Sequence, residues 1–361
     1  MWITSSLEAA KAPTNVALGN FDGVHLGHQQ VMAQILSETT LDKSTQENSA
    51  PKLCTDSLAA FHDGVLASGY TQLPAITSEV STGLSGSDLV SAPEKEGASA
   101  YSTVVTFSPH PHEYFSGNAR PLLTPVAEKA WQLTKLGVDQ LIMLPFNQAL
   151  AELSPQDFVE RILIQGLKAQ RISVGSDFHF GKGRSGNAEK LVEIAAAHGV
   201  PVVQVPLKHA QGDRISSSRI RAALQSGEPT VAAQLLGRPY TLTGRVVQGQ
   251  QLGRTIGFPT ANLQLPGKKF LPCTGVYSVR IYGVDGNTSP LKGVMNIGYR
   301  PTVDGQAISI EIHILNWSGD LYGKMLTVSL EGFVRPEQKF ESLEALKSQI
   351  AKDRDIAAAS L

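Results

Sequence analysis

Several features are scarce in this chain, and each scarcity argues against a class of protein. Its 361 residues include only two cysteines, Cys54 and Cys273, too few for a disulfide framework or a thiolate zinc site. No run approaches the roughly 20 apolar residues of a membrane-spanning helix, and the N-terminus lacks the layout of a signal peptide. The formal net charge is only −1, so there is no basic field for nucleic acid. Because 42% of the residues are hydrophobic, we expect real cores and a cytoplasmic enzyme of about two domains, without nucleic-acid or membrane partners.

A glycine-rich turn near the N-terminus is the most informative segment. GNFDGVHLGH, residues 19–28, follows the apolar run Val16–Leu18 and precedes a helical pattern. A strand that ends in such a turn directs the N–H groups and the positive dipole end of the next helix at one anion site. His25 and His28 add imidazole donors there, so the turn suits the phosphates of a nucleotide. It is neither a Walker A loop nor a G-x-G-x-x-G fingerprint, and a tight turn with one structural histidine is the plainer alternative.

Strand-like and helical patterns alternate from Val16 to about Gly237. The predicted strands are Val16–Leu18, Thr103–Phe107, Gln140–Leu144, Arg171–Val174 and Val202–Val205. This alternation predicts an α/β domain with a doubly wound parallel sheet, whose ligands bind at the carboxyl ends of the strands. Residues 41–100 interrupt the rhythm with a stretch rich in Ser, Thr, Gly, Ala and Glu, which we interpret as a flexible insertion.

The pattern changes after Gly237-Arg238-Pro239. Strand-like runs then follow one another without helices between them, at Tyr240–Val247, Gly275–Tyr282, Leu291–Ile297, Ile308–Leu315 and Met325–Leu330. Consecutive strands predict an antiparallel sheet or small β-barrel, followed by a C-terminal helix from about Leu343 to Ala351. We therefore divide the chain into domains 1–238 and 239–361.

Three further segments of the first domain are candidates for its site. TFSPHP (106–111) and VGSDFHFG (174–181) each follow a predicted strand. SSSRIR (216–221) opens a helix at which Arg219 can reach a phosphate. A rigid proline turn, a packed aromatic loop and a capped helix with a solvated arginine are the respective alternatives.

Two segments of the second domain carry chemistry. GQQLGRTIGFPTAN (249–262) has closely spaced glycines, which let a backbone approach phosphates, and then two hard oxygen donors, Thr260 and Asn262, that suit partial coordination of Mg²⁺. The strand Ile308–Ile314 alternates, with isoleucines on one face and Ser309, Glu311 and His313 on the other. A merely solvated carboxylate is the alternative reading of Glu311, and no chemistry is assigned to His313.

These motifs resemble a known family. H-x-G-H resembles the nucleotidylyltransferase superfamily. In order, GNFDGVHLGH, TFSPHP, VGSDFHFGKGRSG and ISSSRIR resemble the adenylyltransferase half of bacterial bifunctional riboflavin kinase/FAD synthetases, and the glycine loop joined to PTAN resembles their kinase half. The resemblance implies that the C-terminal domain phosphorylates riboflavin with ATP to FMN. It implies that in the N-terminal domain FMN attacks the α-phosphorus of ATP, giving FAD and pyrophosphate, with Mg²⁺ at both steps. The 41–100 insertion and Gln248, often histidine in the family, are departures.

The resemblance also implies roles for individual residues. Glu311 matches the base that accepts the proton of the riboflavin 5′-hydroxyl, and His25, His28 and Arg219 match the catalytic residues of adenylyl transfer. The ATP ligands are Gly19, Phe21, Gly23, His25, His28, Ser217, Ser218 and Arg219 in the first domain, and Gly249, Gly253, Arg254 and Gly257 in the second. The flavin ligands are Pro109, Asp177, Phe178 and Arg335, and the metal ligands are Thr260 and Asn262. Phe333 and Phe340 lie in the stretch that borders the flavin, although for Phe340 we favour a core position.

Other functions are weighed against this one. In the first alternative, one site turns over while the other only binds. The second alternative is a flavin-binding regulator without turnover. The third is an H-x-G-H enzyme that acts on another substrate, such as a cytidylyltransferase or a tRNA-charging enzyme. The regulator predicts gaps at Thr260, Asn262, Glu311 or His28, and none is missing. The near-neutral charge disfavours tRNA, and the PTAN domain disfavours both other substrates. The oligomeric state stays open, with a homo-oligomer among the options.

Overall fold

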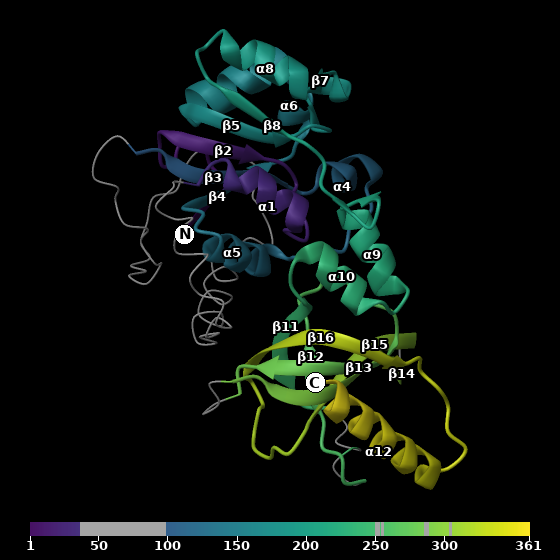
Figure 1. The fold of residues 1–361 in the computed structure, drawn as a ribbon. Helices are drawn as coiled ribbons and strands as arrows, with labels where there is room; N and C mark the ends of the chain where they lie inside the picture. Colours follow the sequence, from purple (N-terminus) through teal and green to yellow (C-terminus); the bar gives the residue numbers. More distant parts are fainter. Residues whose placement is uncertain (37–98, 250–252, 254–255, 285–288, 303–304) are drawn as a thin grey trace. The chain divides into compact units, whose positions relative to one another are not determined.

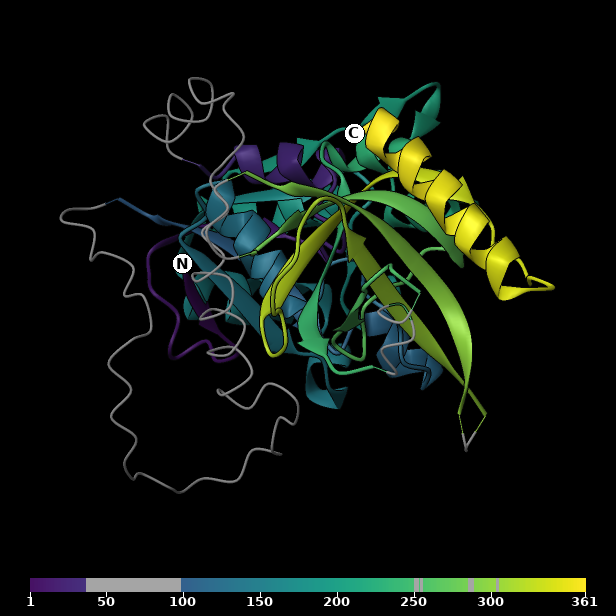
Figure 2. The same cartoon turned by 90° about the horizontal axis from the view of Figure 1, so that it is seen from below.

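The computed structural model describes all residues except 37–98, 250–252, 254–255, 285–288 and 303–304. The described chain forms two compact units, drawn from two directions in Figures 1 and 2. The first unit runs to Ile215, and the second begins at Ser216. The boundary between the two units therefore lies before two helices, whereas the sequence-based boundary at 238/239 places these helices in the first domain. The predicted insertion lies almost wholly outside the described residues.

The first unit is built on a parallel sheet, as the alternating pattern predicts. Its strands are hydrogen-bonded in the order β1-β4-β3-β2-β5-β8, and each neighbouring pair is parallel. They are β1 (Trp2–Thr4), β2 (Thr14–Leu18), β3 (Tyr101–Ser108), β4 (Gln140–Pro145), β5 (Ala169–Gly175) and β8 (Val202–Val205). Because β3 and β4 lie on one side of β2 while β5 and β8 lie on the other, the strand order reverses between β2 and β5. Ligands of open α/β sheets bind at this switch point, outside the carboxyl ends of the strands.

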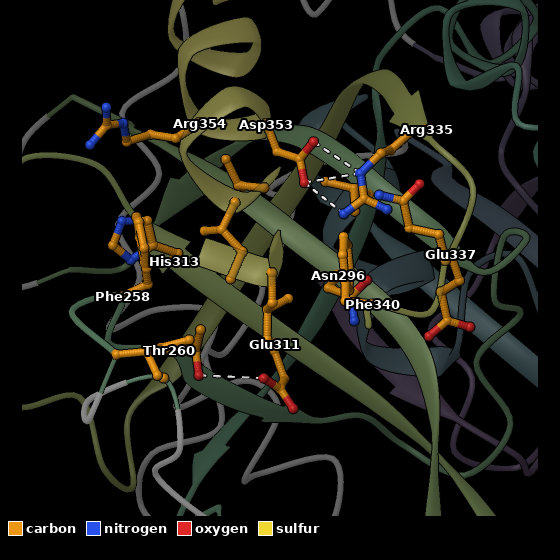
Figure 3. Close-up of a pocket in the computed structure, with 17 residues that line it drawn as sticks. Phe258, Thr260, Asn296, Glu311, His313, Arg335, Glu337, Phe340, Asp353 and Arg354 are labelled. Atoms are coloured by element: carbon orange, nitrogen blue, oxygen red, sulfur yellow. Dashed lines mark hydrogen bonds and ion pairs between the residues drawn. The ribbon is translucent and has the colours of Figure 1, made fainter. Parts of the chain in front are cut away.

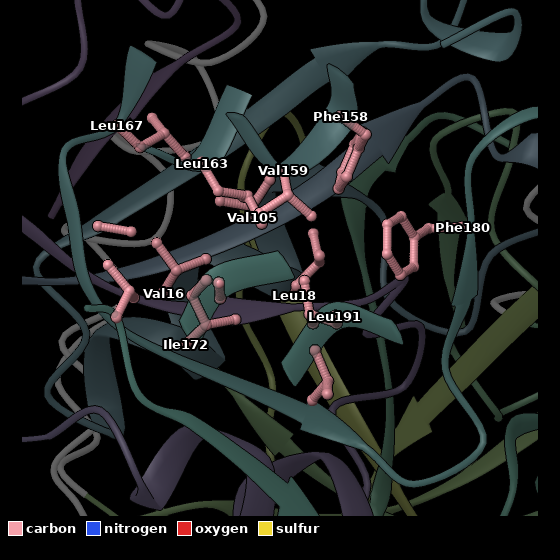
Figure 4. Packing of buried hydrophobic residues seen from close by; sticks show 14 of the residues in the cluster. Val16, Leu18, Val105, Phe158, Val159, Leu163, Leu167, Ile172, Phe180 and Leu191 are labelled. Atoms are coloured by element: carbon pink, nitrogen blue, oxygen red, sulfur yellow. The ribbon is translucent and has the colours of Figure 1, made fainter. Parts of the chain in front are cut away.

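Both faces of the sheet are buried, which confirms the doubly wound architecture. Val16 and Leu18 point toward a cluster that includes residues of η1 (Phe158–Gly166) and α8 (Ala188–Ala196), shown in Figure 4. Ala17, between them, points to the opposite face and is also fully buried. On a parallel sheet this pattern requires helices on both faces.

The remaining described helices of the first unit are α1 (Leu26–Ala33), α4 (Pro111–Ser116), α5 (Val126–Lys135), α6 (Gln148–Ala151), α7 (Pro155–Asp157) and the 3₁₀ turn η2 (Lys182–Arg184). Four of them, α1, α4, α6 and α7, begin at a side-chain cap. At α7, Ser154 Oγ accepts a hydrogen bond from the Asp157 N–H (3.0 Å), and Pro155 occupies the first turn, where its missing N–H costs nothing. The helix continues as the π-helix η1. Two short hairpins complete the unit: β6 (His179–Phe180) with β7 (Gly186–Asn187), and β9 (His209–Ala210) with β10 (Asp213–Arg214).

The second unit is a closed antiparallel barrel, which confirms the second half of the predicted fold. Its strands follow the order β11-β12-β15-β14-β13-β16, and β16 pairs with β11 to close it. They are β11 (Tyr240–Val247), β12 (Ala261–Gln264), β13 (Gly275–Tyr282), β14 (Leu291–Thr302), β15 (Gly305–Ile314) and β16 (Met325–Arg335). Helix α10 (Pro229–Leu236), which follows α9 (Ser217–Gln225), packs on β11 and β16, whereas α12 (Leu343–Ser360) packs on β13, β14 and β16.

Several boundaries differ from the sequence-based prediction. Strands β1 and β12 were not predicted as strands, because neither of their sequences, WIT and ANLQ, is an uninterrupted apolar run. Strands β14 and β16 continue beyond Ile297 and Leu330, where cross-strand pairing extends them past the hydrophobic pattern. Helix α12 runs nine residues beyond the predicted Ala351, to Ser360. Its last part packs against the barrel and buries Asp353 and Ala357, which the charged sequence after Ala351 does not suggest. Among the described helices, none has both the length and the apolar composition needed to cross a membrane.

Candidate active sites

The turn after β2 has a strained backbone that neighbouring groups hold in place. Phe21 and Val24 have φ angles of +48° and +45°, a region that residues other than glycine rarely occupy. The Asp22 carboxylate accepts a hydrogen bond from the Thr124 N–H (3.2 Å), and Thr124 Oγ1 accepts one from the Gly23 N–H (2.9 Å). Strain of this kind persists only where the surroundings over-determine it, and it gathers at functional sites.

The two histidines of the turn lie together at the start of α1. His25 caps the helix, and its Nδ1 accepts a hydrogen bond from the His28 N–H (3.2 Å). The two rings stack with their centroids 3.5 Å apart, and Phe21 meets His28 edge-on. Because Nδ1 of His25 is an acceptor, the proton of the neutral ring is on Nε2, which is a donor. An imidazole N–H therefore lies beside a helix N-terminus whose first turn carries no acidic side chain, a combination that binds phosphate.

Basic side chains adjoin this turn. Lys129 Nζ donates to the Asn20 carbonyl (2.9 Å), and burial lowers the pKa of Lys129, an effect that Asp22 opposes. His110, which follows Pro109, caps α4 with its Nδ1. Burial, and next the positive charge of Arg120, lowers the pKa of His110 from 6.5 to about 4. The imidazole of His110 is therefore neutral at physiological pH.

This depressed pKa predicts a loss of stability in mild acid. The unfolded chain protonates His110 near pH 6.5 and the folded chain only near pH 4, so the folded state loses stability as the pH falls through this window. At pH 5 the loss is about 1–2 kcal/mol relative to pH 7.5. His110→Asn keeps a capping side chain without a titrating group. Urea unfolding at both pH values is expected to show this extra loss in the wild type only, and parallel pH dependence of the two proteins would contradict the assignment.

The loop after β5 lies on the other side of the switch point. Asp177 forms an ion pair with Arg214 from the β9–β10 hairpin, and its carbonyl contacts His179 Nδ1 (2.9 Å). The Phe178 ring stacks on Phe180, with centroids 5.7 Å apart, and packs against the core cluster. The backbone thus places Asp177 at the carboxyl edge of the sheet, whereas Phe178 contributes to packing there.

An exposed aromatic cluster, which the sequence analysis missed, borders the loop after β3. Phe115 on α4 is 71% exposed, and its ring meets those of Tyr114 and Phe146 edge-on. Phe146 also contacts Phe107 of β3. The motif TFSPHP pointed to this loop, but the aromatic residues that follow it carried no recognisable spacing.

The SSSRIR segment begins α9 as the sequence predicts. Ser216 caps the helix, and its Oγ accepts a hydrogen bond from the Arg219 N–H (3.2 Å). Ser217 and Ser218 occupy the first turn, where their N–H groups are not used by the helix. These residues belong to the second compact unit.

In the barrel, strand pairing aligns three polar side chains. Glu311 of β15 is paired with Asn262 of β12 on one side and with Asn296 of β14 on the other. Paired residues point to the same face, so these side chains form a row on the outer surface of the barrel, while Ile310 and Ile312 are buried inside. This confirms the predicted alternation of β15.

Hydroxyl groups hold the Glu311 carboxylate. Ser309 Oγ donates to its Oε1 (3.1 Å), and Thr260 Oγ1 lies 3.5 Å from its Oε2. His313, on the same face, donates from Nδ1 to the Pro259 carbonyl (2.9 Å) and so fixes the residue next to Thr260. Glu311 is therefore oriented by its surroundings rather than merely solvated.

The glycine loop leaves space for the side chain of Asn262, one of the two predicted metal ligands. A methyl group at Gly249 would overlap the side-chain amide of Asn262, so only glycine allows this side chain its position. Gly253 and Gly257 also belong to the described residues, whereas Arg254, predicted to bind ATP, lies outside them.

A pocket of about 360 Å³ opens beside Glu311 (Figure 3). Its lining includes polar residues of the barrel and the apolar side chains of Phe340, Leu346 and Ile350. The core position favoured for Phe340 is therefore wrong: its ring lines the pocket, where the guanidinium of Arg335 lies 5.7 Å from the ring centroid. The volume lies within the range of small-molecule sites.

Arg335 is held at this pocket by a buried carboxylate. Its Nε and Nη2 donate to Asp353 at 2.7–3.0 Å, and Gln349 donates to the same carboxylate (2.9 Å). The side chain of Asp353 is only 3% exposed. Arg335 also donates to the Pro336 carbonyl (3.0 Å), so it joins β16, α12 and the segment that bears Phe340. Sequence reasoning missed Asp353, since a carboxylate on a charged helix gives no sign of its burial.

These two sites define the class of protein. A glycine turn with paired histidines at the switch point of a parallel sheet is suited to binding nucleotide phosphates. A hydroxyl-held carboxylate beside hard oxygen donors and a ligand pocket suits transfer of a phosphoryl group to an alcohol. The fold and sites therefore define a two-site, nucleotide-dependent transferase.

Comparison with known proteins gives the family. The riboflavin kinase family model matches residues 236–361, and the FAD synthetase family model matches residues 7–47 and 89–219. The chain belongs to the family of bifunctional riboflavin kinase/FMN adenylyltransferases. It is 44% identical to such a protein from Pseudomonas fluorescens over 72% of this chain and 81% of that protein. It is 33% identical to one from Haemophilus influenzae over 95% and 93%. A solved structure described as a macrolide-efflux protein from Streptococcus pneumoniae shares the fold over 99% of this chain and 98% of its own, with 26% identity and a TM-score of 0.73.

Proposed function

We propose that the chain makes FMN from riboflavin at the barrel site and FAD from FMN at the parallel-sheet site, consuming one ATP at each. The observation that carries the kinase step is the Glu311 carboxylate, held by Ser309 and Thr260 at the edge of a pocket of about 360 Å³. The adenylyl-transfer step is supported by His25 and His28 at the N-terminus of α1.

At the barrel, Glu311 is the general base. The 5′-hydroxyl of riboflavin donates a hydrogen bond to the carboxylate, which takes the proton as the oxygen attacks the γ-phosphorus of ATP and ADP leaves. Phe340, Leu346 and Ile350 are proposed to receive the flavin ring, because they contribute apolar surface to the pocket. Arg335 holds one wall of this pocket through its bonds to Asp353. The backbones of Gly249, Gly253 and Gly257 approach the phosphates.

Thr260 and Asn262 would hold Mg²⁺ with the phosphates of ATP. Both carry neutral oxygen donors, which suit a hard cation, and Asn262 occupies space that a side chain at residue 249 would fill. When bound, the ion neutralises charge that develops on the transferring phosphoryl group.

We expect Gly249→Ala to raise the Mg²⁺ concentration needed for half-maximal FMN formation about tenfold, since the added methyl group turns Asn262 away. A Mg²⁺ titration of initial rates measures this. Gly267→Ala is the matched control, because a methyl group there meets no atom within 4 Å. The same Mg²⁺ requirement in Gly249→Ala as in the control would exclude Asn262 as a ligand.

At the parallel sheet, a phosphate oxygen of FMN attacks the α-phosphorus of ATP and pyrophosphate leaves. Little covalent chemistry is asked of the protein, so positioning and charge stabilisation dominate. The Nε2–H of His25, the ring of His28 and the N–H groups of α1 stabilise the phosphates, with Gly19, Phe21 and Gly23 shaping the turn. Ser217, Ser218 and Arg219, which begin α9, are proposed as phosphate ligands on the strength of the family motif alone.

Flavin recognition at this site rests on the loops after β3 and β5. Pro109 and Asp177 belong to these loops, and Phe178 supports the second of them. The exposed ring of Phe115 offers an apolar surface to the isoalloxazine.

We assign adenylylation to the domain of residues 1–238 and phosphorylation to the domain of residues 239–361. The small substrates and the use of ATP in both reactions favour a cytoplasmic enzyme without nucleic-acid or membrane partners.

A time course of products tests the function. Purified protein is incubated with riboflavin, ATP and MgCl₂, and the flavins are separated by chromatography. FMN is expected first and FAD later. FMN without FAD would contradict the adenylyltransferase assignment, and neither product from folded protein that still binds flavin would support the regulator instead.

A further inference from the structure

Among the polar groups that line the pocket beside Glu311, two take no part in the phosphoryl-transfer mechanism and lie next to each other. Asn296 and Glu337 both line it, and Figure 3 shows them on the same side of the pocket. Within the described part of the chain, neither side chain has a hydrogen-bond or ion-pair partner in the protein. A polar group that faces a ligand pocket without a partner is suited to binding the ligand.

Strand register fixes where Asn296 lies relative to the base. In the row Asn262–Glu311–Asn296, Glu311 is central, and the two asparagines flank it on neighbouring strands. Paired side chains in such a ladder are separated by about 5 Å at Cβ. Asn262 is on the side of the proposed metal and phosphates, so Asn296 is on the side away from them.

Glu337 and Asn296 converge above Gly298. Gly298 follows Asn296 by two residues on β14 and therefore shares its face. A methyl group at Gly298 would overlap the Glu337 carboxylate and lie 3.2 Å from Asn296 Nδ2. An amide and a carboxylate thus share one small region beside Glu311, which glycine keeps open.

The chemistry of riboflavin matches this placement. A chain with three secondary hydroxyls joins its flat ring to the 5′-hydroxyl that reacts. When the 5′-hydroxyl meets Glu311, the hydroxyls next to it come within reach of the region that Asn296 and Glu337 share. An amide both donates and accepts hydrogen bonds and a carboxylate accepts them, as a chain of hydroxyls requires.

We propose that Asn296 and Glu337 bind the hydroxyls of the ribityl chain and set the preference of the kinase site for flavins that carry it. The proposal rests on the kinase function proposed above. A flavin without the ribityl chain leaves Asn296 and Glu337 without these hydrogen bonds. The kinase site therefore binds such a flavin much more weakly than riboflavin.

Two flavins that differ only in this chain provide the test. Riboflavin and lumiflavin, which has a methyl group in its place, are titrated into the full chain with MgADP, and binding is followed by quenching of flavin fluorescence. Asn296→Leu is expected to raise the Kd of riboflavin about tenfold and to change that of lumiflavin less than twofold. Glu337→Gln, at an exposed position that tolerates change, is expected to show the same selective loss, about threefold.

Parallel weakening of both flavins in either variant would overturn the proposal, because it would indicate a disturbed ring pocket. Unchanged binding of riboflavin in both variants would overturn it as well. The kinase function is checked separately by FMN formation in the wild type. If FMN forms while both variants bind both flavins normally, only the ribityl assignment fails. If no FMN forms, the kinase function fails first. Gly267→Ala serves again as the control for handling and folding.

Discussion

Glu311→Gln is expected to slow FMN formation about 10²–10⁴-fold and to leave the formation of FAD from supplied FMN unchanged. Glutamine keeps the length of the side chain and can still contact Ser309 and Thr260, but it cannot accept the proton of an attacking hydroxyl. Initial rates with riboflavin and with FMN as separate substrates measure the two steps independently.

The barrel itself supplies a matched control for this variant. Glu331 on β16 is also held by a serine two residues before it, with Ser329 Oγ donating to the carboxylate (2.6 Å), but Glu331 does not line the pocket. Glu331→Gln is therefore expected to retain both activities. If Glu311→Gln and its control were equally active, the assignment of the base would be wrong.

His28→Ala is expected to produce the opposite result, with FAD formation reduced about 10²–10³-fold and FMN formation retained. The variant removes an imidazole from the N-terminus of α1 and the stacking partner of His25. His28→Asn restores a hydrogen-bond donor and is expected to recover part of the activity. His198→Ala serves as the control. His198 follows α8 and contacts Glu160, and it does not belong to the histidine turn after β2.

Equal loss of both activities in His28→Ala, with the protein still folded, would contradict two separate sites. Circular dichroism of each variant separates this outcome from unfolding. Together with Glu311→Gln, the variant makes a double dissociation in one chain, which a single shared site cannot produce.

The sequence predicted the elements whose hydrophobic pattern is local. The central strands of the sheet are apolar on both faces, and β15 alternates between apolar and polar residues. The sequence alone therefore predicts these strands. The motif after β2 was recognised because its glycines and histidines follow a strand directly.

What the sequence missed depends on partners far away in the chain. The row formed by Asn262, Glu311 and Asn296 depends on the register of three strands, and no segment alone specifies that register. Asp353 looked solvated, but the guanidinium of Arg335, 18 residues earlier, pairs with it in the interior. Phe340 was assigned to the core because an aromatic residue has the same composition signal whether it packs a core or lines a pocket.

Closure of the barrel has a consequence for association. Since β11 pairs with both β12 and β16, the described barrel presents no free edge strand along which another chain could add by backbone hydrogen bonding. The parallel sheet does end in edges, but β1 has three residues and β8 four, and such short edges are poor templates. Self-assembly of this protein would therefore be expected to proceed through side-chain surfaces, and β-type aggregation would first require one of these sheets to open.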